Sequence, residues 1–197
     1  MSQRLYDYWN LLELSYDDAV DFLKNKYGSV IDDYFKKDSY NGFMYSKIGA
    51  HGALQRGHYS RTSDGLYCHH ISEDKYLNAT SIDYCVMQNI PFSVHEKQNL
   101  VYADLVEHLI LHVLITVKTR GKFGYPGVIT YLLPQMLDWY VDKNVPTDWQ
   151  KNCYKASYLT PDEAKVITSK IYHLLKKTFS DEQNFTSDIK ELVRNYK

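Results

Sequence analysis

The apolar residues of the chain recur mostly at the three- and four-residue spacing of amphipathic helices, so the sequence predicts a mainly helical protein. Helices are expected over residues 1–27, 29–38, 74–87, 100–118, 128–143, 161–179 and 186–196. The start of the 161–179 helix is marked by Thr160 as N-cap and Pro161 at the first position. Residues 39–63 are rich in Gly, Ser and Tyr and are expected to form loops and turns.

One short run departs from this helical pattern. Gly65-Leu66-Tyr67-Cys68 is apolar and bounded by a turn, which indicates a β-strand leading into His69 and His70. Neighbouring side chains of a strand point to opposite faces, so the two histidines are expected to have different roles. One of them can complete a metal site while the other faces a substrate.

A second pair of histidines lies in the strongly apolar stretch 100–118. His108 and His112 are four residues apart, so their side chains share one helix face about one turn apart. Neutral imidazoles at this spacing can bind one small metal ion together. Taken alone, His108 and His112 could instead be two histidines packed in the protein without a metal ion. The pattern becomes more specific when His69 and His70 on the strand, and Asn99 nine residues before His108, are considered together with them.

Together, His69-His70-Ile71, Asn99-Leu100-Val101 and His108-x-x-x-His112 resemble the motif of the HNH, or ββα-metal, endonucleases. This family includes the colicin-type DNases and many phage and restriction endonucleases. The resemblance covers residues 64–112 and does not extend to the rest of the chain. It implies an α+β fold that is mainly helical, with a small ββα-metal motif embedded among flanking helices.

The resemblance also implies a role for each matching residue. His69, His108 and His112 would bind one divalent metal ion, with Mg²⁺, Mn²⁺, Zn²⁺ and Ni²⁺ as candidates. His70 would be the general base that activates the attacking water, a role that suits an imidazole near neutral pH. Asn99 would hold the loop between the strands and the helix. The metal would stabilise the charge that develops on the phosphoryl group.

The sequence departs from the family pattern in two respects. His70 and Asn99 are 29 positions apart, wider than a compact ββα hairpin needs, so residues 72–98 are expected to contain an insertion. The paired Cys-x-x-Cys motifs of many family members are absent, and the 3 cysteines do not form a disulfide framework. Cys68 is interpreted as a small buried strand residue, with an extra ligand or a nucleophile as the alternatives.

Charge is distributed in a way that suits a phosphodiester substrate. The net charge of −1 argues against a protein that coats nucleic acid indiscriminately. Residues 39–63 and 108–137, however, each contain three Lys or Arg side chains and no acid, although chance clustering is an alternative. Arg61 is the first candidate for stabilising the transition state, as arginines near the motif do in the family. The candidate nucleic-acid contacts are Lys47, Arg56, Lys118, Arg120 and Lys122.

The chain is expected to be a single domain over residues 1–197. It divides into a helical and loop N-terminal extension (1–63), a ββα-metal core (64–118) and C-terminal helices (119–197) that can pack, bind a protein partner or form a homodimer. No run approaches twenty apolar residues, so no membrane contact is expected. The first residues lack a secretion signal, so a cytoplasmic location is expected.

The sequence therefore predicts a metal-dependent HNH-type endonuclease that hydrolyses phosphodiester bonds, with DNA as the expected substrate. Such a protein would suit a phage, a mobile element or a defence system, a setting that follows only from analogy with the family. The alternative is a non-catalytic module that binds protein or nucleic acid and in which the metal site is structural. A zinc peptidase is disfavoured, because Leu109 stands where such enzymes have a glutamate after the first helical histidine.

Overall fold

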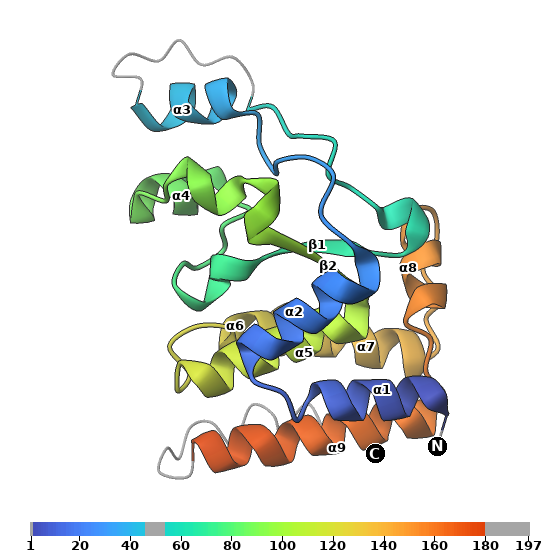
Figure 1. The fold of residues 1–197 in the computed structure, drawn as a ribbon. Coiled ribbons are helices and arrows are strands. Elements are labelled where there is room, and N and C mark those ends of the chain that lie inside the picture. Colours follow the sequence, from blue (N-terminus) through green and yellow to red (C-terminus); the bar gives the residue numbers. More distant parts are fainter. Residues whose placement is uncertain (1, 46–53, 180–197) are drawn as a thin grey trace.

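The computed structural model describes residues 2–45 and 54–179. The expected helix 186–196 and Lys47 lie outside these ranges. Within them the protein is mainly helical, with one small antiparallel sheet, which confirms the α+β architecture (Figure 1). The helices are α1 (Gln3–Leu11), α2 (Tyr16–Tyr27), α3 (Lys37–Tyr45), α4 (Ile82–Gln88), α5 (Leu105–Lys118), α6 (Tyr125–Gly127), α7 (Leu133–Tyr140), α8 (Gln150–Ala156) and α9 (Pro161–Thr178).

Two strands and several tight turns complete the chain. Strand β1 (Tyr67–His70) pairs with β2 (Leu100–Ala103). Short 3₁₀ turns are η1 (Thr62–Asp64), η2 (Ile71–Asp74), η3 (Phe92–His95) and η4 (Lys97–Asn99), and Val128–Leu132 forms a π-helical turn, η5. Among the helices of the described ranges, none combines the length and the apolar composition needed to span a membrane.

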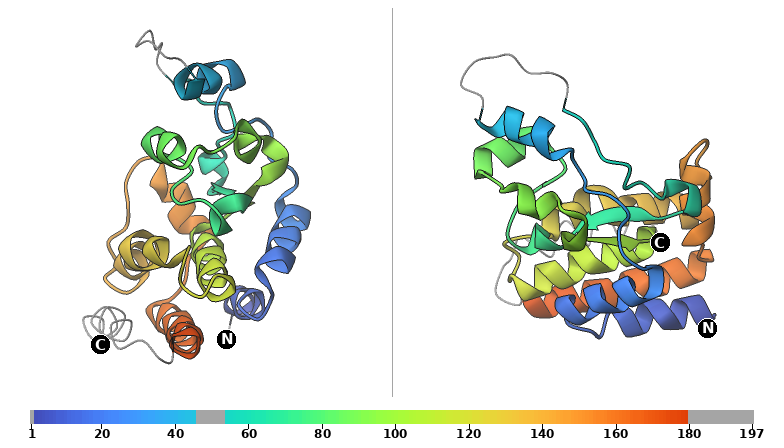
Figure 2. Two further views of the ribbon diagram at one scale, coloured as in Figure 1. Left: turned by 90° about the vertical axis from the view of Figure 1, so that its left-hand side faces the viewer. Right: turned by 45° about the horizontal axis from the view of Figure 1, so that its top comes forward.

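Helix α5 is the centre of the larger core. Ten of its side chains are buried, because its sequence is apolar on nearly every face. It contacts α1, α2, α7 and α9 as well as both strands, and the views in Figures 1 and 2 place it between the sheet on one side and α1 and α9 on the other. The apolar faces of α7 and α9 are buried in the same core, so packing accounts for their hydrophobic stripes.

The sheet separates two hydrophobic clusters. In the antiparallel register His69 lies opposite Val101 and His70 lies opposite Leu100. Val101 belongs to the larger cluster around α5, whereas Leu100 belongs to a smaller cluster built from residues 30–40 and 79–94. Successive residues of each strand therefore face different cores, and the expectation that His69 and His70 point to opposite faces is confirmed.

The prediction of one helix over 100–118 is wrong at its beginning. Residues 100–103 form β2, and α5 starts at Leu105 with Asp104 as its N-cap. The Asp104 side chain accepts a hydrogen bond from the Glu107 backbone, and the Glu107 side chain accepts one from the Asp104 backbone. This reciprocal capping box fixes the start of α5 directly after β2. The site elements therefore follow one another along the chain as β1, β2 and α5.

Two further predicted helices are also wrong in whole or in part. Residues 29–36 are irregular, because their backbone pairs with distant segments: Tyr34 N–H donates to His95 and Lys36 N–H donates to Gln55. The expected helix 74–87 is reduced to α4. Helix α3 begins at Lys37, near the end of the expected helix 29–38, and runs into the segment 39–63 that was expected to form loops; α8 was not predicted. The helices expected over 1–27, 128–143 and 161–179 are confirmed, the first as α1 and α2 and the second with a π-helical turn at its start.

Candidate metal centre

Three of the four predicted site histidines meet where β1 packs on α5. The ring centroids of His69 and His108 are 5.1 Å apart, and those of His108 and His112 are 5.0 Å apart. One nitrogen from each of the three rings lies within 4.8 Å of the others. The predicted ligand set His69, His108 and His112 is therefore close enough to hold one metal ion.

The hydrogen bonds around His69 leave a nitrogen lone pair directed at this cluster. The Tyr16 hydroxyl donates to the Ile71 carbonyl at 2.8 Å, so its oxygen is left to accept from His69 Nε2–H at 3.0 Å. His69 Nδ1 is then unprotonated, and it is buried without a hydrogen-bond partner among the described residues. His108 Nδ1 is likewise buried without a hydrogen-bond partner among the described residues. Buried polar atoms of this kind need a partner, and a cation supplies one.

Burial keeps these imidazoles neutral, as metal ligands must be. It lowers the pKa of His69 to about 3, with the nearby His112 and His70 rings acting in the same direction and Glu73 against it. Burial likewise holds the pKa of His108 well below its usual range. Neither ring is therefore protonated at neutral pH.

Glu73, in the turn that follows β1, is a site residue that the sequence analysis missed. Its Oε2 lies 3.1 Å from His112 Nε2 and 3.9 Å from His69 Nδ1. Ligand atoms of a tetrahedral site stand roughly 3.3 Å apart when each metal bond is about 2.0 Å, so Glu73 is a candidate fourth ligand beside His69 and His112, although the ligand atoms that all lie within 4.8 Å of one another are those of the three histidines. The signal available in the sequence was an acid four residues after His69, just beyond the expected strand.

The contact between His112 and Glu73 requires either a metal ion or a proton between the two side chains. His112 Nδ1 lies 3.4 Å from the Gly124 carbonyl, which can accept only from an Nδ1–H. In that tautomer the Nε2 lone pair faces a carboxylate oxygen. Two electron-rich atoms 3.1 Å apart require a metal ion or a proton between them.

His70 is buried in the smaller cluster, with one nitrogen directed back toward Glu73. Its Nε2 lies 3.1 Å from His95 Nδ1, and His95 Nε2 lies 3.8 Å from the sulfur of Cys85. The Cys85 thiol donates to the Ala79 carbonyl, so its sulfur is left to accept from His95 Nε2–H. This chain makes His95 Nδ1 the acceptor of His70 Nε2–H. His70 Nδ1 then carries the lone pair, 3.7 Å from Glu73 Oε1.

The other two residues assigned catalytic roles lie away from the histidine cluster. Asn99 donates to the Ser93 carbonyl at 2.7 Å, which ties together the turns that precede β2. Arg61 donates to Asp64 and to the Tyr27 carbonyl, and its guanidinium lies over the Tyr102 ring, on the smaller-cluster side of the sheet. The structure thus gives Arg61 a bridging role between α2 and the turn before β1, and its part in the transition state stays a prediction.

Two of the cations predicted to contact nucleic acid make contacts within the protein. Lys118 pairs with Asp17 at 2.8 Å and with Asp74 at 2.9 Å. Arg56 lies over the Tyr34 ring at 5.5 Å. Their contact with nucleic acid stays a prediction. The remaining candidates are Arg120 and Lys122, in the turn after α5, and Lys47, outside the described residues.

A cleft of about 520 Å³ opens onto the candidate metal centre. His108, His112 and Glu73 form part of its wall, and none of its described lining residues is a lysine or an arginine. Its other lining residues are Tyr76, Leu77, Asn78, Thr80, Tyr84, Gly124, Pro126, Gly127, Thr130, Tyr131 and Leu132. The cleft lies between the segment from η2 to α4 and the segment formed by α6 and η5.

Gly127, the last residue of α6, leaves room for the His112 ring. A Cβ added at Gly127 would overlap His112 Nδ1 and lie 2.7 Å from Cε1. The backbone of Gly127 is ordinary helix, with φ −62°, so alanine is unfavourable there for steric reasons alone.

We expect Gly127→Ala to displace the His112 ring and weaken metal binding by about 10- to 100-fold, the range typical of changes that disturb a ligand's surroundings. Isothermal titration with Zn²⁺ or Mn²⁺ measures this effect. Gly42→Ala is the matched control, because a Cβ there meets nothing within 4 Å. Equal affinities for the two variants would contradict the placement of His112.

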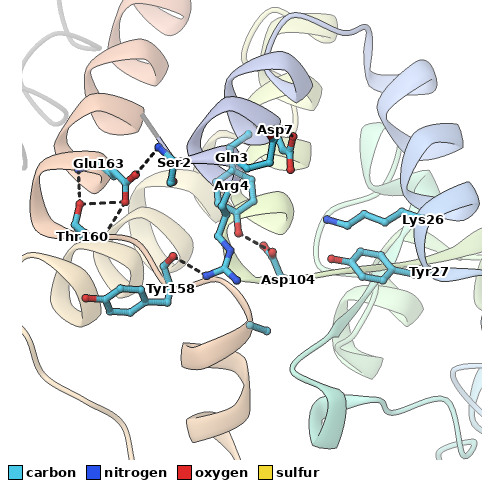
Figure 3. A pocket seen from close by; sticks show the side chains of 12 residues that line it. Ser2, Gln3, Arg4, Asp7, Lys26, Tyr27, Asp104, Tyr158, Thr160 and Glu163 are labelled. Carbon is cyan, nitrogen blue, oxygen red and sulfur yellow. Dashed lines mark hydrogen bonds between the residues drawn. The ribbon is translucent and has the colours of Figure 1, made fainter.

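A second pocket, of about 580 Å³, lies at the N-terminal end of α5 (Figure 3). Its polar groups are paired with one another: Tyr8 donates to Asp104, Arg4 donates to the Tyr158 carbonyl, and Lys26 pairs with Glu107. These contacts join α1, α2 and the segment before α9 to the start of α5. The pocket is therefore explained by packing between helices.

The pocket also predicts a pH dependence of stability. Burial, together with repulsion from Glu107, raises the pKa of Asp104 to about 7. A carboxyl with a raised pKa favours the folded state when protonated, so this contribution is present below pH 4 and is lost as pH rises to about 7. We expect the free energy of unfolding to fall by on the order of 2–4 kcal/mol from this group. In Asp104→Asn, urea unfolding at pH 5 and pH 8 should show a smaller difference than in the wild type.

The chain was compared with protein-family models, with curated proteins and with solved structures, and it matches none of them.

Proposed function

We propose that the protein is a metal-dependent HNH-type endonuclease that hydrolyses phosphodiester bonds, with DNA as its substrate. The observation that carries the proposal is the meeting of His69, His108 and His112 at the junction of β1, β2 and α5, beside a cleft. This is the arrangement that the HNH resemblance predicts. The neighbouring His70 supports it, because its unprotonated Nδ1 is directed toward the same centre.

In this proposal the side chains divide the work of hydrolysis. His69, His108 and His112 hold a divalent ion, which supplies Lewis-acid stabilisation of the charge developing on the phosphoryl oxygens. His70 accepts the proton of the attacking water at Nδ1. His95 holds the tautomer of His70 through the Nε2 hydrogen bond, as second partners of functional histidines commonly do.

Glu73 favours a second candidate function. Four protein ligands around one ion are typical of structural sites, whereas catalytic sites keep one position open for water or substrate. If Glu73 stays bound, the metal would join β1 to α5 and stabilise the fold of a protein- or nucleic-acid-binding module. The two candidates therefore differ in whether Glu73 leaves the metal when a phosphodiester arrives.

The test is cleavage of circular single-stranded DNA and of supercoiled plasmid with Mg²⁺, Mn²⁺, Zn²⁺ or Ni²⁺, beside His70→Ala. Cleavage that needs the metal, stops with a chelator and is lost in the variant would support the endonuclease. A protein that retains one metal ion per chain and cleaves neither DNA with any of these metals would instead support the structural-metal module.

A further inference from the structure

The cleft beside the histidines carries aromatic rings in place of cations. Tyr131 is 69% exposed and Tyr84 is 38% exposed, and Tyr76 lines the same cleft. Within residues 2–45 and 54–179, none of these three rings stacks on another aromatic side chain. A large exposed tyrosine at the mouth of a polar site is a ready surface for a flat ligand.

This lining does not suit a double helix. Duplex binding relies on lysine and arginine contacts along the phosphate backbone, and the described wall of the cleft has neither. The bases of a duplex also stack on one another, so their ring faces are not available to side chains. Unpaired bases do offer these faces, and proteins bind them by stacking on aromatic rings.

We propose that the cleft binds unpaired nucleotides of a single-stranded nucleic acid, with a base stacked on Tyr131 and the following phosphate at the histidines. This inference rests on the proposed function and names its substrate class. The volume of about 520 Å³ falls within the range of pockets that enclose small ligands, roughly 300–1,000 Å³. A bound divalent ion would supply the positive charge that the cleft wall lacks.

The neighbouring polar groups fit the same occupant. Asn78, Thr80 and Thr130 line the same cleft as the tyrosines and the histidines. Amide and hydroxyl groups can donate to phosphate oxygens and to base edges without fixing a sequence. The cleft therefore predicts binding that is selective for strandedness more than for sequence.

The test compares the binding of fluorescein-labelled 12-nucleotide strands by the full chain in the presence of Zn²⁺ or Mn²⁺. Single-stranded DNA, single-stranded RNA and the DNA duplex form the three arms, read by fluorescence anisotropy. We expect a single strand to bind at least about 10-fold more tightly than the duplex, and the two single-stranded arms distinguish DNA from RNA. Cleavage of the same three substrates is measured in parallel.

Tyr131→Ala should weaken single-strand binding by about 5- to 150-fold, because stacking on one base contributes about 1–3 kcal/mol. Tyr131→Phe keeps the ring and should stay close to the wild type. Tyr6→Ala removes a tyrosine that is 52% exposed on α1 and is the matched control.

Equal binding of single strands and duplex, or no effect of Tyr131→Ala, would overturn the proposal, even if metal-dependent cleavage is observed. Tyr131-dependent binding of single strands without any cleavage would support the cleft assignment and count against the endonuclease. Failure of the single-strand proposal can thus be distinguished from failure of the endonuclease proposal.

Discussion

Replacing His70 by alanine is expected to slow phosphodiester cleavage by about 100- to 10,000-fold, the usual contribution of a general base. His70 Nδ1 is the nitrogen that the hydrogen-bond chain through His95 and Cys85 leaves unprotonated. Metal binding should persist, because His70 faces the smaller cluster and the ligand histidines lie on the other side of β1. Initial cleavage rates at saturating metal, with bound metal measured by titration, check both halves of this prediction.

His58→Ala provides the control, since that histidine is exposed. His70→Gln is the second variant, because it keeps a polar side chain in the buried position next to His95. Both His70 variants should show circular dichroism spectra like that of the wild type. Cleavage at the wild-type rate by a folded His70 variant would exclude this residue as the base.

Replacing His108 by alanine is expected to weaken metal binding by at least about 100-fold, since even indirect disturbance of a ligand weakens binding by about 10- to 100-fold. Binding of a metal to the folded state also raises thermal stability. At a metal concentration 100 times the dissociation constant the gain is about 2.7 kcal/mol, or roughly 5–10 °C for a domain of this size. The wild type should show this shift on addition of metal and His108→Ala should not.

His173→Ala is the appropriate control for this experiment, because His173 is exposed on α9. Differential scanning calorimetry with and without Zn²⁺ or Mn²⁺ gives the shift for each protein. If His108→Ala and the wild type gain equally, the bound ion lies elsewhere. Because His108 Nδ1 has no hydrogen-bond partner, the variant loses no hydrogen bond at that nitrogen, and it is expected to fold.

Side-chain periodicity explains why the meeting of His69, His108 and His112 could be predicted from the sequence. Residues four apart share a helix face, and successive strand residues alternate, so His108 and His112 had to meet and His69 and His70 had to separate. Glu73 and His95 carry no such periodic signal. Their positions depend on how η2 and η3 fold over the ends of the strands, which is decided by contacts between distant segments.

The helix boundary at Asp104 was missed for a different reason. Residues 100–103 are apolar and continue into an apolar helix, and a short apolar run fits both a buried strand and a buried helix. The capping box formed by Asp104 and Glu107 was the local signal that separates the two. Similarly, the close approach of Gly124 and Gly127 to His112 has no local signal, because it depends on the packing of α6 against α5.

Because β1 directs successive residues into different cores, the proposed metal ligand and the proposed base are adjacent in sequence but packed in separate surroundings. Substitutions in the smaller cluster, around Phe35 or Ile90, can change the environment of His70 without touching the side chains that hold the metal. Under the proposed function, changes along α5 and α6 would act on the metal ligands, and Glu73, which faces both His70 and His112, would link the two surroundings. Evolution could then adjust proton transfer and metal affinity separately at every position except Glu73.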